Sequence, residues 1–118
     1  MFEKFCECFI EYLNRHIDRI KEYFEECIHE ILLATETKSF DLKNYDFMIT
    51  TLQYYDVINA ICKNFFDCKP SNIPSELEKK IIHLIKTLDK MQKDYKEIQN
   101  FITKIEKMIL LKRYVYLK

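Results

Sequence analysis

The five cysteines are the most unusual functional groups of this chain, and their spacing limits the chemistry they could support. Cys6 and Cys8 are two positions apart, so on a helix their side chains point roughly 200° apart and cannot both bind one metal ion. Cys6 and Cys27 fall in an apolar helical pattern and are interpreted as small core residues. Cys68 would lie level with Cys8 in an antiparallel helical hairpin. A disulfide from Cys68 to Cys8 or Cys6 is therefore a hypothesis.

Glu26 and His29 have the Glu-x-x-His spacing that di-iron helical bundles use. The sequence holds no second copy of this motif. Both residues also fall on the charged side of the first predicted helix, whereas a di-iron site needs carboxylates that point into the core. We therefore expect no metal and no cofactor.

The remaining nucleophiles and bases form no recognisable catalytic group. The histidines belong to different predicted surfaces: His16, His29 and His83. The serines all fall at predicted turns, where helix capping explains them: Ser39, Ser71 and Ser75. The chain has no glycine, and phosphate-binding loops and dinucleotide motifs depend on glycine. These observations predict a protein that is not an enzyme.

Lysine forms the most distinct charged surface, a row on the outer face of the third predicted helix. Its members are Lys79, Lys86, Lys90, Lys93, Lys96, Lys104 and Lys107. Such a row could follow the phosphates of a nucleic acid. The simpler alternative is a solvated helix face, because Asp89, Asp94 and Glu97 interrupt the row.

Charge is also divided along the chain. Residues 1–34 hold four basic and eight acidic side chains, whereas residues 76–118 hold eleven and six. This division favours attraction between the first and third predicted helices, either within one chain or between two.

Long amphipathic helices must position all of these side chains. In the third predicted helix, apolar residues follow one another at alternating steps of four and three, which defines a heptad seam. The seam runs through Leu77, Ile81, Leu84, Leu88, Met91, Tyr95, Ile98, Ile102, Ile105 and Ile109. Ser75 and Glu78 form a capping box at its start. We expect this helix over about residues 75–113.

A second seam predicts a first helix over residues 2–34. It runs through Cys6, Ile10, Leu13, Ile17, Ile20, Phe24, Cys27, Ile31 and Ala34. Between the two seams, residues 40–68 predict a helix that Ser39 or Asp41 can cap. This middle helix carries more apolar residues than one face can hold. It must either lie between the other two helices or offer apolar surface to another chain.

Composition agrees with a helical protein. The 118 residues are 48% hydrophobic and 32% charged, with zero net charge, no glycine and two prolines. This balance favours a single folded domain, residues 1–118, and disfavours folds rich in strands and tight turns. The sequence shows no membrane span and no secretory signal, so an intracellular, cytoplasmic location is expected.

The sequence therefore predicts an all-α protein with three long helices in an up-down-up antiparallel bundle, which self-associates, with a homodimer as the expected form. The expected function is non-enzymatic protein–protein binding or self-assembly, as in a small accessory or inhibitor protein of a virus or plasmid. The predicted interface residues are Phe2, Phe5, Phe9, Tyr12, Tyr54, Phe65 and Phe66. A helical dimer that binds nucleic acid through the lysine row is the alternative.

Overall fold

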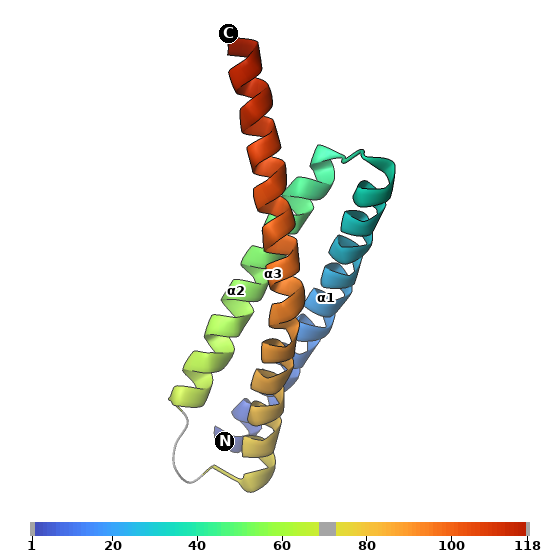
Figure 1. Ribbon diagram of the computed structural model, residues 1–118. Helices are drawn as coiled ribbons and strands as arrows, with labels where there is room; N and C mark the ends of the chain where they lie inside the picture. The colour runs from blue at the N-terminus through green and yellow to red at the C-terminus, as the bar shows by residue number, and fades with distance from the viewer. Residues whose placement is uncertain (1, 69–72, 118) are drawn as a thin grey trace.

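The computed structural model is an all-α bundle of three helices, as the sequence predicts. It describes residues 2–68 and 73–117, with side chains described at 3–68 and 73–111. Helix α1 spans Phe2–Thr37, α2 spans Leu42–Asp67 and α3 spans Ser75–Leu117. Each helix packs against the other two. Helices α1 and α3 run in the same direction and α2 runs opposite to both, which is the predicted up-down-up order (Figure 1).

The molecule is a rod rather than a sphere. Its dimensions are 65 × 26 × 19 Å and its radius of gyration is 18.5 Å. A compact domain of this length would have a radius of gyration of about 13–14 Å. Helix α3 sets the long dimension, because its 43 residues span about 65 Å at about 1.5 Å each.

Helix α1 buries its predicted seam from Cys6 to Ile31. The helix ends three residues later than predicted, at Thr37. Lys38 then takes a left-handed backbone conformation with φ of 57°, and its amide donates to the carbonyl of Ala34 at 2.9 Å. Glycine is the usual residue at this closing position of a helix. In a chain without glycine, a lysine occupies it.

Asp41 caps helix α2, because its carboxylate accepts a hydrogen bond from the backbone N–H of Lys43 at 3.0 Å. Helix α2 packs against both neighbours, which is the first of the two arrangements that the sequence allows. The buried side chains are Met48, Thr51, Leu52, Tyr55, Ile58 and Cys62. Among its large apolar side chains, Leu42 and Val57 remain exposed.

Helix α3 begins at Ser75, as predicted, and continues to Leu117 rather than ending near residue 113. Its seam lies in the core from Leu77 to Ile102, with Tyr95 half-buried. The last two seam residues, Ile105 and Ile109, are only half-buried, in contrast to the prediction. The reason is that α1 ends and α2 begins before α3 is complete, so no neighbouring helix covers the last turns of α3 (Figure 1).

Two tyrosines on facing helices fix α2 against α3. The hydroxyl of Tyr55 donates a buried hydrogen bond to the carbonyl of Leu88 at 2.7 Å. The hydroxyl of Tyr95 donates to the carboxylate of Asp56 at 3.1 Å. The two rings lie 5.1 Å apart between their centroids. The hydroxyl of Tyr55 is buried and needs such a partner, so its bond favours one register of α2 on α3.

Candidate protein-interaction surface

Most of the aromatic side chains predicted to form an interface lie at the junction of α1 and α2, whereas Phe66 lies beside Ile82 and Ile85 of α3. Phe5 stacks on Phe9 with ring centroids 5.9 Å apart, and Phe9 lies 5.0 Å from Phe65. Phe9, Phe65 and Phe66 are half-buried and pack against the core. Phe5 and Tyr12 are exposed, by 59% and 52%. The side chain of Phe2 lies outside the described residues. The structure therefore leaves Phe5 and Tyr12 as the accessible part of this predicted interface.

Tyr54, another predicted interface residue, joins α2 to α1. A hydrogen bond connects its hydroxyl to Nδ1 of His16, a half-buried residue that Tyr12 contacts edge-on at 4.3 Å. Burial raises the pKa of Tyr54, and the guanidinium of Arg19 opposes this effect. Tyr54 is half-buried and already has partners within the chain. We therefore interpret it as a residue that holds the bundle together.

Exposed apolar residues gather instead at the opposite end of the rod, beside the connection between α1 and α2, residues 38–41. We call this the turn end. The ring of Phe40 packs on that of Phe101, 5.1 Å away, and Ile102 is the last core residue of α3. The exposed large apolar side chains at this end are Leu32, Leu33, Leu42, Met108, Leu110 and Leu111. These six are most of the large apolar side chains that the described part of the chain exposes.

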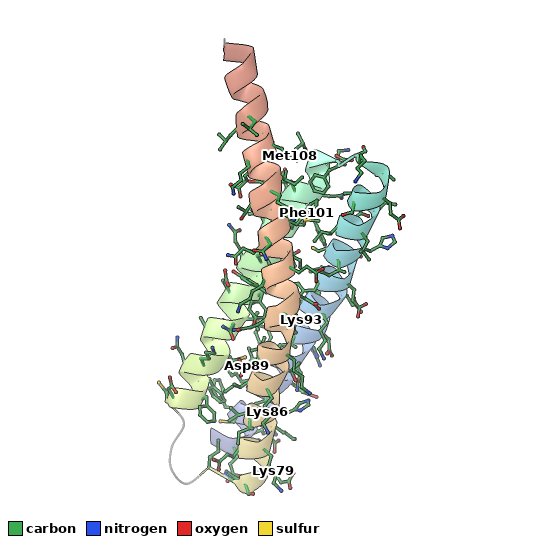
Figure 2. All side chains as sticks on the ribbon, viewed as in Figure 1. Lys79, Lys86, Asp89, Lys93, Phe101 and Met108 are labelled. Atoms are coloured by element: carbon green, nitrogen blue, oxygen red, sulfur yellow. The ribbon has the colours of Figure 1, made fainter. Side chains whose placement is uncertain are left out.

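The most prominent element of the turn end is the final part of α3, residues 103–117, which we call the α3 extension. It continues past the α1–α2 connection, and Met108 lies on it beyond Phe101 (Figures 1 and 2). None of its described side chains, residues 103–111, is buried. Met108, Leu110 and Leu111 are exposed by 55%, 63% and 65%, beside the half-buried Ile109. Four consecutive apolar residues on an uncovered helix are unfavourable in water unless something binds them.

A groove with acidic walls runs between α1 and α2 near the same end. We call it the acidic groove. It has a volume of about 630 Å³, and its lining includes Glu22, Glu25, Glu26, Glu30, Asn44 and Phe47. The side-chain amide of Asn44 donates to the carboxylate of Glu30 at 2.8 Å. Phe47, which is half-buried, packs edge-on against Tyr23 at 5.5 Å. The groove therefore combines carboxylates with an aromatic wall.

All seven lysines of the predicted row are exposed on α3. Lys79, Lys86 and Lys93 follow one another along the helix, with Asp89 between them (Figure 2). The row ends at Lys104 and Lys107, which belong to the α3 extension. The lysine row is thus continuous with the apolar run of that extension, rather than a separate surface.

Glu26 and His29 are exposed, as predicted, and both line the acidic groove. Among the described residues, no group of three or more histidine, cysteine, aspartate or glutamate side chains is arranged to hold a metal ion. In the same part of the chain, no helix has the length and apolar character needed to cross a membrane.

All five cysteines are free thiols in the structure. The contact between Phe9 and Phe65 places Cys8 and Cys68 at the same end of the bundle, and both thiols are exposed. The predicted disulfide between them is not formed in this structure. The other three thiols are buried, and burial raises the pKa of Cys27 and of Cys62 to about 11.

Thiol labelling should therefore separate two classes of cysteine. In the native protein at pH 8, we expect Cys8 and Cys68 to react rapidly, and the buried cysteines at least about tenfold more slowly, because the thiolate is the reactive form. Mass spectrometry after timed labelling measures this difference. Under denaturing, non-reducing conditions all five should react. Labelling at only three would instead show that a disulfide exists.

Sequence reasoning did not single out Met108, Leu110 and Leu111 as exposed apolar residues. A signal was present, because four apolar residues follow one another from Met108 to Leu111 and no single helix face can bury them all. The third predicted helix was also the longest of the three. A partner helix that ends earlier must leave part of it uncovered.

No protein-family model, curated protein or solved structure matches this chain.

Proposed function

We propose that this protein acts without enzymatic chemistry, by binding a polypeptide through the α3 extension. The observation that carries the proposal is the exposed run from Met108 to Leu111 on a helix that leaves the bundle. A small accessory or inhibitor protein of a virus or plasmid would work in this way, since it needs a binding surface and no catalytic site.

The exposed apolar surface of the α3 extension favours binding of a partner. Burying it yields about 25 cal/mol per Å², so an uncovered helix with three large exposed side chains has free energy to gain from a partner. A helix whose apolar side chains lie in a groove of another protein is a common recognition mode. Methionine suits such a surface because its flexible side chain adapts to irregular partners. Phe5 and Tyr12 form a smaller exposed patch near the other end of the rod.

A photo-crosslinking amino acid at position 110 tests the proposal in cells that produce the protein. We expect a covalent adduct with a polypeptide at this position. The matched control is position 57, because Val57 is also exposed, by 55%, but lies on α2 within the bundle. If position 110 gives no more adduct than position 57, the α3 extension is not a binding surface and the proposal fails.

The exposed lysine row supports nucleic-acid binding as the second candidate function. A protein that neutralises several phosphates loses affinity steeply as salt rises. Lys79→Glu, Lys86→Glu and Lys93→Glu together reverse charge on the part of the row that lies outside the α3 extension. We expect this variant to abolish any DNA or RNA binding seen in a mobility-shift assay at 50 mM salt. Unchanged binding, or none by the original protein, would remove this alternative.

A further inference from the structure

We infer that the partner of the α3 extension is a second copy of this chain, and that the extension of one copy lies in the acidic groove of the other. This inference rests on the proposed function, because it assigns a partner to the surface that carries that function. Charge, length and the position of the apolar residues support it independently.

The two surfaces carry opposite charge. Residues 22–37, at the end of α1, contain five glutamates and no lysine or arginine. Residues 103–117, the α3 extension, contain four basic residues and one acidic residue. The described basic side chains, Lys104 and Lys107, are exposed, and so are Glu22, Glu25 and Glu26 in the groove. Complementary surfaces of this kind steer two proteins together and select against partners of like charge.

The same charges oppose direct pairing of two α3 extensions. Antiparallel pairing would bring Lys104 and Lys107 of one copy beside the basic residues of the other, with one glutamate in each extension to offset them. Like charges in contact across an interface cost free energy. The acidic end of α1 is therefore the favoured place for the extension.

The lengths also agree. The 15 residues of the extension span about 22 Å and the 16 residues of the acidic stretch span about 24 Å, at about 1.5 Å per residue. In an antiparallel arrangement, the extension covers the acidic stretch from one end to the other. In this register the run from Met108 to Leu111 would lie level with Leu32 and Leu33 and with the turn of α1 just before them, so that one side of the run faces these two leucines at the turn end.

The arrangement can be reciprocal. Each copy has one extension and one acidic groove near the same end of the rod, so a two-fold axis can place each extension in the groove of the other copy. Such a contact closes on itself and gives a dimer, the commonest symmetric assembly. This arrangement gives the homodimer expected from the sequence a specific interface.

Two charge-reversal variants test the inference, and sedimentation at 50 mM salt measures their dimerisation. The protein concentration ranges over about 1–200 µM, which spans dissociation constants on the order of those common for weak dimers. The first variant is Lys104→Glu with Lys107→Glu. The second is Glu22→Lys with Glu25→Lys and Glu26→Lys. These side chains are exposed, and far-UV circular dichroism checks that both variants stay helical.

We expect the original protein to sediment at twice the 14.5 kDa of one chain, and each variant alone to dimerise at least about tenfold more weakly. An equimolar mixture of the two variants should regain the dimer, because the acidic extension of one then meets the basic groove of the other. The inference is overturned by a monomeric original protein, by variants that dimerise normally, or by a mixture that stays monomeric.

A third variant separates this inference from the proposed function. Met108→Gln, Leu110→Gln and Leu111→Gln together remove the apolar run and leave the charges unchanged. If this variant loses the dimer while the charge variants keep it, the extension binds a second copy outside the acidic groove. If the crosslink at position 110 joins only a different protein, the proposed function stands and the second copy is excluded as the partner. If no crosslink forms, both fail.

Discussion

Phe24→Ala is expected to lower the free energy of unfolding by about 3–5 kcal/mol, as for other large-to-small changes in protein cores. Phe24 is the largest fully buried side chain of α1, and its ring lies 5.5 Å from that of Tyr55 on α2. Its removal loses apolar burial and leaves a cavity between packed helices, which relax only in part. Urea unfolding followed by far-UV circular dichroism measures the loss.

Phe5→Ala is the matched control, because Phe5 lies on the same helix but is 59% exposed. We expect it to cost less than about 1 kcal/mol, since its main ring contact is with Phe9. Equal destabilisation by the two changes would mean that the α1 seam is not sealed from water. The three-helix packing would then be wrong.

Stability is expected to fall steeply between pH 9 and pH 11. Burial raises the pKa of Cys27 and of Cys62 from 9.0 to about 11. Well below pH 9 both thiols are protonated in the folded and the unfolded protein. Between these values the unfolded chain loses protons that the folded protein keeps, so rising pH favours unfolding. At about 1.4 kcal/mol per pKa unit, the two thiols together would cost at most roughly 5 kcal/mol, and the full loss is reached only above pH 11.

The double variant Cys27→Ala with Cys62→Ala isolates this effect from other alkaline titrations, including that of Tyr55, whose pKa burial also raises. The variant should be less stable at pH 7, because it loses two buried sulfur atoms. Its free energy of unfolding should depend less on pH above 9 than that of the original protein. Parallel pH profiles for the two proteins would show that the thiols do not contribute.

Much of this fold follows from local sequence patterns. The steps of four and three predict the buried faces of α1 and of α3 up to Ile102, since helical geometry places such residues on one side. Ser75 and Glu78 predict the start of α3, and Asp41 is one of the two predicted caps for α2. These features depend on neighbours within a few positions. A single sequence contains that information directly.

The candidate surface was harder to predict, because it depends on where different helices end. Ile105 continues the seam in sequence. It is only half-buried, because α1 and α2 are joined by a turn before they could cover it. The sequence predicts both Phe9 and Phe65 as residues that could bind a partner. In the structure they pack against each other, because α1 and α2 turn these two side chains toward one another. The relative length and rotation of helices are tertiary properties, and apolar spacing within one helix does not determine them.

Amide hydrogen exchange along α3 should show whether the α3 extension is protected from solvent. A helical segment of about 15 residues is only marginally stable alone in water, so its backbone amides should exchange quickly where no neighbouring helix protects them. Amides between Leu77 and Ile102 can open only when the bundle opens. One continuous helix thus has a protected part and an unprotected part, and slowing of exchange in the second part would show directly when and where a partner binds.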